Sequence, residues 1–301
     1  MKDYKNHLLI ATGAVILMAL SSCTRTVERD HAPTYGVLAM LGLQLLAPPV
    51  LPGPGPMSFE AFRSQAYRQT IDGVFTGNYV VSGDISASGE DRLREVYHEY
   101  VASYLRANGS STAAPQQITQ ALIAYNIAGT DVMWNPTDRM NITYCISPRF
   151  GVRHADVVNA MAGATGAWQA AAGIRFIYVP GEDVNCTSAN LNVVFDVQPT
   201  SGTPYLAVAF YPNDNRVNRR ISIDANSFWV SPPYTLVGIL RHELGHVLGL
   251  RHEQTRPEAG ICMEDNAWRT LTTYDTASVM HYPQCNGTGD GSFVLTALDA
   301  Q

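Results

Sequence analysis

Apolar and polar positions recur with two different periods along this chain, and each period predicts a type of element. The segment SGEDRLREVYHEYVASYLRA, residues 88–107, places apolar side chains three and four positions apart, and Ser88 stands three residues before Asp91, as at a helix start. We predict an amphipathic helix here. The preceding NYVVSGDIS, residues 78–86, predicts a strand interrupted by a Ser-Gly turn.

Beyond about residue 131, short apolar runs alternate with longer helical patterns, and no internal repeat is visible. Strands followed by a helix that carries polar side chains predict an α+β domain with one twisted sheet. We expect strands at residues 141–147, 174–180, 191–197, 206–212 and 219–225, and helices at 154–173 and 234–250.

The first residues have the layout of a secretory signal, with two lysines, an apolar run over residues 8–20 and then small residues. The run ends in LSSC, similar to the bacterial lipobox, in which cleavage precedes a cysteine that is then diacylated. We predict a lipoprotein signal peptide over residues 1–22 and lipidation of Cys23, with Thr24 favouring the outer membrane of the cell envelope. The alternatives are an ordinary signal peptide, and hence secretion, or an uncleaved anchor.

Prolines and glycines in APPVLPGPGP, residues 47–56, exclude regular structure, so residues 23–57 are expected to form a tether. The 301 residues are 46% hydrophobic, which is enough for one sizeable core. The formal net charge is −6 and no block is rich in lysine or arginine, so we expect no nucleic-acid partner.

If Cys23 is lipidated, four cysteines remain in an oxidising compartment, and they allow three pairings that sequence alone cannot choose among. We favour Cys145 with Cys186 and Cys262 with Cys285, because the second pair would staple a C-terminal lobe. Buried free thiols are the alternative.

The stretch RHELGHVLGLRHEQ, residues 241–254, predicts a metal centre. His242 and His246 lie four residues apart and therefore share one helix face. Gly249 can end the helix in a left-handed conformation, which lets His252 return as a third ligand. Three imidazoles suit one zinc ion and leave a position open for water, as in catalytic sites. Glu243 is then placed to act as general base on that water and to pass the proton to the leaving amine.

The motif HELGHVLGLRH fits HExxHxxGxxH, the signature of metzincin zinc endopeptidases, and SVMHY, residues 278–282, is similar to the methionine turn of that family. The two motifs occur in the expected order. The resemblance implies three zinc ligands, a general base and an apolar floor under the metal: His242, His246, His252, Glu243 and Met280.

Within the metzincins the chain most resembles the astacins, which share the glutamate after the third histidine and an S-x-M-H-Y turn. The resemblance implies that Tyr282 ligates the resting zinc and stabilises the oxyanion; a core aromatic is the alternative. Glu253 would meet the processed N-terminus, or else be a plain surface glutamate. By contrast, LAVAFYP, residues 206–212, is more similar to the matrixins, in which a strand nearby forms the exposed edge that pairs with substrate.

The resemblance covers residues 131–301 and implies a metzincin-like catalytic domain, with a twisted, mostly mixed sheet and an active-site helix, after a small pro-region at 58–130. Astacin pro-regions carry an F-x-G-D motif, and VSGD, ending at Asp84, is similar with valine in place of phenylalanine. Asp84 would then occupy the water position and keep the enzyme latent, although a Gly-Asp turn explains the same residues. No cysteine stands between Cys23 and Cys145, so a matrixin-type cysteine block is excluded.

These observations predict an exported, lipid-anchored zinc endopeptidase that is made latent and binds protein or peptide substrates in extended form. The alternative is a non-catalytic surface binding lipoprotein on a metzincin scaffold, against which Glu243 argues because binding alone would not need it. A structural zinc domain would need a fourth ligand, and no convincing histidine or cysteine lies close in sequence.

Overall fold

The computed structural model describes residues 55–301 except 72–73, 82–83, 109–121, 261 and 263. The predicted signal peptide, the lipidation of Cys23 and most of the tether lie outside the described residues. The described residues belong to one compact unit. Within these ranges, no helix is both long enough and apolar enough to cross a membrane.

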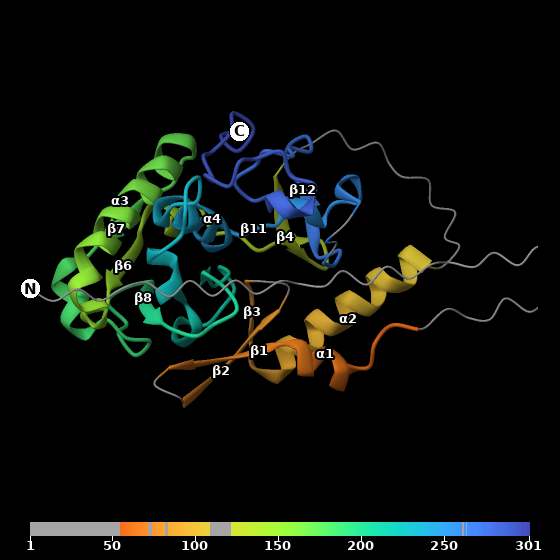
Figure 1. Cartoon of the computed structure of the whole chain (residues 1–301), viewed down its shortest axis with the longest axis horizontal. Coiled ribbons are helices and arrows are strands. Elements are labelled where there is room, and N and C mark those ends of the chain that lie inside the picture. The colour runs from red at the N-terminus through yellow and green to blue at the C-terminus, as the bar shows by residue number, and fades with distance from the viewer. Residues whose placement is uncertain (1–54, 72–73, 82–83, 109–121, 261, 263) are drawn as a thin grey trace, which may run out of the picture. The chain divides into compact units, whose positions relative to one another are not determined.

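A mixed five-stranded sheet, of the kind expected from the sequence, forms the framework of the C-terminal part (Figure 1). Four strands run parallel and the last, at one edge, runs antiparallel to its neighbour. In spatial order they are β7 (Phe176–Tyr178), β6 (Ile142–Ile146), β8 (Phe195–Thr200), β10 (Arg220–Asp224) and β9 (Ala207–Val208).

All five expected strands are shorter than their predicted ranges, and two of them show the local reason. The run 191–197 enters the sheet only at Phe195, because the residues before it form turns, and Leu191 is exposed. The run 206–212 pairs with β10 only at Ala207 and Val208, because the carboxylate of Asp214 then accepts the N–H of Tyr211 and turns the chain away.

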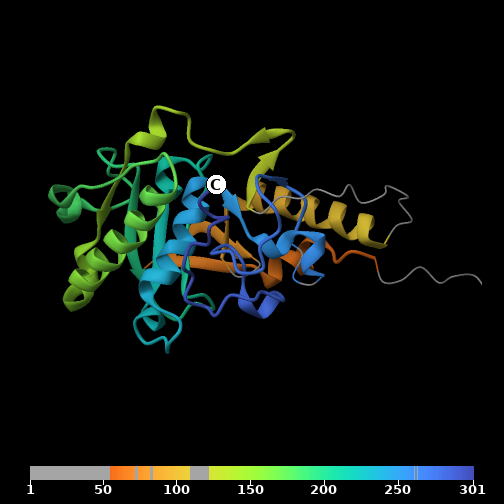
Figure 2. The ribbon, with the colours of Figure 1, turned by 90° about the horizontal axis from the view of Figure 1, so that it is seen from above.

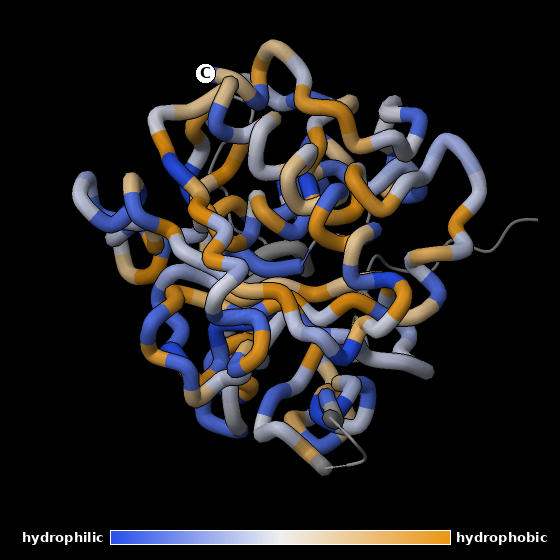
Figure 3. The backbone as a smooth tube through the Cα atoms, turned by 90° about the vertical axis from the view of Figure 1, so that its left-hand side faces the viewer, coloured by the Kyte–Doolittle hydropathy of each residue, from blue (hydrophilic) through white to orange (hydrophobic). Residues whose placement is uncertain are grey.

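Two long helices cover one face of this sheet, namely α3 (His154–Ala171) and α4 (Leu236–Leu248) (Figures 1 and 2). They lie side by side, and the indole N–H of Trp168 on α3 donates to the carbonyl of Arg241 on α4 at 2.8 Å. Alternate residues of β6, namely Ile142, Tyr144 and Ile146, join them in the main core. Apolar stretches accordingly run through the middle of the fold (Figure 3).

A smaller sheet borders the end of α4. Its strands are β4 (Ile123–Ile127), flanked by β11 (Leu250–Arg251) and β12 (Trp268–Thr270), with β5 (Thr130–Asp131) paired to β4. Ile123, Ala124 and Tyr125 are fully buried, and the N–H of Tyr125 donates to the carbonyl of Gly249 at 2.7 Å. Thus β4, which lies in the segment assigned from sequence to the pro-region, is built into the sheet that follows α4.

The rest of the N-terminal region contains the predicted helix and the predicted interrupted strand, together with a short helix and a first strand that were not predicted. The elements are α1 (Phe59–Gln65), an antiparallel sheet of β1 (Tyr67–Ile71), β2 (Val74–Val81) and β3 (Ile85–Ser88), and the helix α2 (Gly89–Asn108). Leu93 and Val96 of the α2 stripe are buried in a separate core, whereas Leu105 near its end is 57% exposed.

Contacts from this N-terminal sheet reach the edge of the five-stranded sheet. The side chain of Gln69 donates to the hydroxyl of Ser222 at 3.0 Å, and that of Ser88 to the carboxylate of Asp214 at 2.8 Å. Ile85 also forms a parallel bridge with Ala209, just beyond β9. These contacts hold the start of β3, and with it Asp84, against the edge of the five-stranded sheet.

Two disulfides join Cys145 to Cys186 and Cys262 to Cys285, with Cα–Cα distances of 5.6 and 5.7 Å. This is the pairing we favoured from the sequence. The second bond connects the segment after α4 to the segment that follows the predicted methionine turn.

Candidate metal centre

The helix that carries the first two histidines has well-defined ends. At its start, the hydroxyl of Thr235 accepts the N–H of Gly238 at 3.0 Å and so satisfies one free backbone donor. At its end Gly249 has a φ of 97°, which favours glycine, and a Cβ there would lie 2.0 Å from the carbonyl oxygen of Val132. This tight turn sends the chain through β11 and back to His252.

The three histidines present their Nε2 atoms to a common point. The Nε2 atom of His252 lies 3.2 Å from Nε2 of His242 and 3.2 Å from Nε2 of His246, and all three side chains are buried. On the other side of each ring, Nδ1 lies close to an oxygen atom. For His242 and His246 it is a backbone carbonyl oxygen, that of Val279 at 2.7 Å and that of Leu250 at 2.8 Å. For His252 it is the carboxylate Oε1 of Glu264 at 2.5 Å. Donation from Nδ1 leaves the Nε2 lone pairs free for a metal.

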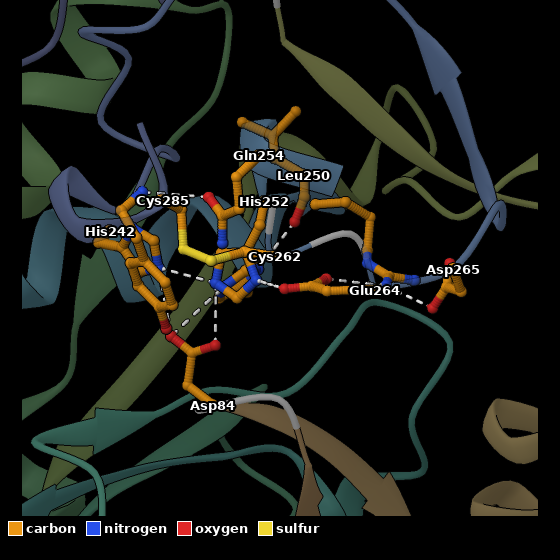
Figure 4. Close-up of polar contacts among 12 residues, drawn as sticks. Asp84, His242, Leu250, His252, Gln254, Cys262, Glu264, Asp265 and Cys285 are labelled. Atoms are coloured by element: carbon orange, nitrogen blue, oxygen red, sulfur yellow. Dashed lines mark hydrogen bonds and ion pairs between the residues drawn. A yellow bond between two sulfur atoms is a disulfide. The ribbon is translucent and has the colours of Figure 1, made fainter. Parts of the chain in front are cut away.

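Asp84 closes the group from the N-terminal region (Figure 4). Its Oδ1 lies 2.9 Å from Nε2 of His252, and its Oδ2 lies 3.2 Å from Nε2 of His242 and 3.7 Å from Nε2 of His246. Bonds of about 2.0–2.2 Å to a tetrahedral zinc ion would place ligand atoms about 3.3 Å apart. The spacing and the donor types therefore fit one zinc ion.

Electrostatics in the site follow from burial and close charges. Burial alone would raise the pKa of Asp84, but the charge of His252 and hydrogen bonds from the three histidines hold this pKa well below its usual range. Burial lowers the pKa of His252, but the charges of Asp84 and Glu264 outweigh it and raise that pKa to about 10, so a metal at Nε2 of His252 would have to displace a proton. His246 has a pKa lowered to about 4, chiefly by burial.

Glu243 lies beside this point and is 2% exposed. It is held by the backbone N–H of Ala209, while its Oε2 makes no hydrogen bond to any residue that the structure describes. Burial, together with the charge of Asp84, raises the pKa of Glu243 well above its ordinary value. A carboxylate with one oxygen restrained and the other free is suited to accept a proton from a nearby water.

The segment 278–282 lies directly under the histidines. Met280 is fully buried, and a Cβ on Gly245 of α4 would lie 2.2 Å from its sulfur, so only glycine permits this contact. The ring of Tyr282 stacks on His242 at 5.3 Å between centroids and lies 4.6 Å from His252. Asp84, Glu243 and Tyr282 thus lie beside the three histidines, while Met280 packs against Gly245 on the helix that carries two of them.

Glu253 is fully buried, so the alternative of a plain surface glutamate is wrong. Its Oε1 lies 3.0 Å from the Nε of Arg256 and accepts the N–H of Asp275 at 3.2 Å. Burial raises the pKa of Glu253 to about 8.

Sequence reasoning missed a buried charged group behind His252. Glu264 contacts the histidine as described, and the guanidinium of Arg251 lies 3.2 Å from Glu264 and 2.6 Å from Asp265. No spacing rule marks these residues, although two adjacent carboxylates shortly after a cysteine and an arginine beside a ligand histidine were the available signals.

A cavity of about 300 Å³ opens beside Asp84, His242 and Glu243. Among the described residues that line it, Asp84 and Glu243 are the only carboxylates. Most of the remaining wall is apolar or aromatic: Pro204, Tyr205, Leu206, Ala207, Tyr234, Ile239, Tyr282 and Phe293, with Gln284. The cavity lies next to β9, so a chain segment extended along this edge can place a side chain in it.

Residues 133–267 match the family model described as Matrixin, whose members use a catalytic zinc ion. The fold and the family match together identify this segment as a metzincin zinc metalloprotease. The matched segment includes α4 and all three histidines and ends before the methionine turn. No curated protein matches the chain.

Proposed function

We propose that this metalloprotease is an exported endopeptidase, made as a latent lipoprotein precursor, with a zinc ion held by His242, His246 and His252. The observation that carries the proposal is the convergence of three Nε2 atoms and one carboxylate on a single point, with the partly free carboxylate of Glu243 beside it. A retained Glu243 is the feature that a purely binding protein would not need.

The chemistry is hydrolysis of a peptide bond. A bound zinc ion supplies a Lewis acid that polarises the scissile carbonyl and acidifies water. Glu243 accepts a proton from the attacking water, whose oxygen bonds to the carbonyl carbon. Glu243 then delivers this proton to the leaving nitrogen as the C–N bond breaks. Tyr282, stacked on His242 at the cavity wall, donates a hydrogen bond from its hydroxyl to the developing oxyanion and keeps its proton.

Latency is assigned to the N-terminal region. Asp84 occupies the position that the attacking water needs, and the bridge between Ile85 and Ala209 covers the chain just beyond β9, where an extended substrate would pair. Since β4 pairs with β11 and β12, we place the start of the catalytic unit near Leu122 rather than at Asp131. Removal of the region before Leu122 would then free the site and leave the five-stranded sheet and the sheet of β4, β11 and β12 intact.

The proposed location is the bacterial cell envelope, with lipid on Cys23 and outer-membrane placement favoured. It is supported by the lipobox-like LSSC and by two disulfides, which persist in oxidising compartments. Incorporation of a labelled fatty acid into the wild-type chain, and its loss in Cys23→Ser, would test the anchor.

A soluble chain from Ser58 to Gln301, loaded with zinc and treated by limited proteolysis, tests the activity. We expect it to cleave an unbiased peptide mixture, and expect cleavage to stop in Glu243→Ala and after chelation while the variant keeps its zinc. Glu258→Ala is the matched control because Glu258 is exposed and belongs neither to the metal-ligand group nor to the cavity lining. Bound zinc without cleavage, before and after proteolysis, would favour the non-catalytic binding lipoprotein instead.

A further inference from the structure

Glu264 contacts the third histidine on the side that faces away from the predicted metal (Figure 4). Its Oε1 lies 2.5 Å from Nδ1 of His252, while Nε2 of the same ring lies 2.9 Å from Asp84. The Glu264 side chain is only 5% exposed. A buried carboxylate in this position accepts the Nδ1 proton and directs the Nε2 lone pair into the site.

The other two histidines are held differently. His242 and His246 project from the rigid helix α4 and donate to backbone carbonyls, those of Val279 and Leu250. His252 lies beyond the helix, in extended backbone with φ −63° and ψ 130°. Its ring lies off α4 and packs against Tyr282, and the contact to Glu264 supplies the hydrogen bond that orients its Nδ1.

Glu264 is itself anchored on two sides. The guanidinium of Arg251, 1% exposed, lies 3.2 Å from its second oxygen and also pairs with Asp265 at 2.6 Å. Two residues before Glu264, the disulfide from Cys262 to Cys285 ties its loop to the chain after the methionine turn. A carboxylate fixed in this way supports a histidine more effectively than one on a free loop.

We propose that Glu264 is a positioning residue of the metal centre, which fixes the ring and tautomer of His252 and strengthens its Nε2 as a donor. This inference rests on the proposed zinc site. Carboxylates that support ligand histidines typically change metal affinity by about 10- to 100-fold. The role differs from that of Asp84, which faces the metal position itself.

The test is the zinc affinity of the full chain, measured by competition with a chromophoric chelator. We expect Glu264→Ala to weaken zinc binding by about 10- to 100-fold, and Glu264→Gln, which keeps an acceptor oxygen, to weaken it less. The control Glu258→Ala should bind as the wild type does. If Glu264→Ala fails to fold, Glu264→Gln carries the test, because its amide has the same shape and still loses the charge.

A double-mutant cycle separates positioning from general destabilisation. In a His252→Ala background, Glu264→Ala should cause no further loss of zinc affinity, and the absorption spectrum of bound cobalt should change in Glu264→Gln but not in Glu258→Ala. An unchanged affinity in Glu264→Ala, or an equal loss in both backgrounds, would overturn the inference. A wild-type chain that binds no zinc would overturn the proposed zinc site, and with it this role.

Discussion

Replacement of Asp84 by asparagine should activate the uncut protein. The carboxylate is 4% exposed and lies within 3.7 Å of Nε2 of all three histidines, so it has no route to water while the region stays in place. Asparagine keeps the shape of the side chain but removes the negative charge that attracts Asp84 to the metal centre. The neighbouring fold should therefore persist while the block weakens.

The size of the effect follows from the loss of one buried charged partner. Removing one member of such a group costs about 3–5 kcal/mol, and the lower value changes the ratio of blocked to open sites by roughly 150-fold. Activity of the uncut chain should rise by up to this factor. The remaining contacts, such as that between Gln69 and Ser222, still favour the blocked form, so the variant should stay below the level reached after proteolysis.

The assay compares initial rates of peptide hydrolysis by zinc-loaded chains from Ser58 to Gln301, before and after limited proteolysis. Asp91→Asn is the matched control, because Asp91 is exposed on α2 and should leave the uncut chain latent. If proteolysis activates the wild type but Asp84→Asn is no more active than the uncut wild type, the region blocks the site without the carboxylate, and our reasoning is refuted.

Three further changes test other parts of the fold. Loss of the disulfide between Cys145 and Cys186, which are 41 residues apart, should lower the free energy of unfolding by about 4 kcal/mol in urea titrations; no change would show that the cross-link does not constrain the unfolded chain. Gly245→Ala should cost about 1–3 kcal/mol in thermal unfolding, because its Cβ overlaps the sulfur of Met280, and an unaffected melting temperature would contradict this close contact. Tyr282→Phe should lower kcat by about 10²- to 10³-fold with unchanged zinc content, whereas a normal kcat would leave Tyr282 a packing residue.

The features that sequence predicted best are those in which spacing alone determines geometry. Because His242 and His246 are four residues apart, they share one face of the helix wherever that helix lies in the fold. Gly249 marks the turn after which the chain brings His252 back to them. The helices α2, α3 and α4 likewise follow from apolar periodicity. The strand expected at 191–197 begins only at Phe195, after turns that leave Leu191 exposed, and the strand expected at 206–212 ends early, where the N–H of Tyr211 donates to Asp214.

The features that sequence could not predict depend on pairing between distant segments. The strand Ile123–Ile127 was not among the predicted elements, and a short apolar run does not identify its partners, so nothing marked it as belonging with β11 and β12. The role of Glu264 could not be predicted for a similar reason. Its position beside His252 depends on the ion pair with Arg251 and on the disulfide at Cys262. A single charged residue in a loop produces no periodic pattern in the sequence.

The arrangement of contacts explains why we expect activation to require proteolysis rather than a simple opening. Asp84 reaches the site from the start of β3, and β3 is held by the bridge from Ile85 to Ala209 and by the hydrogen bond from Ser88 to Asp214. Breaking one contact leaves the others to guide the segment back, and its effective concentration at the site stays high. Cutting the chain before Leu122 removes this advantage, because the released region must then rebind as a separate partner.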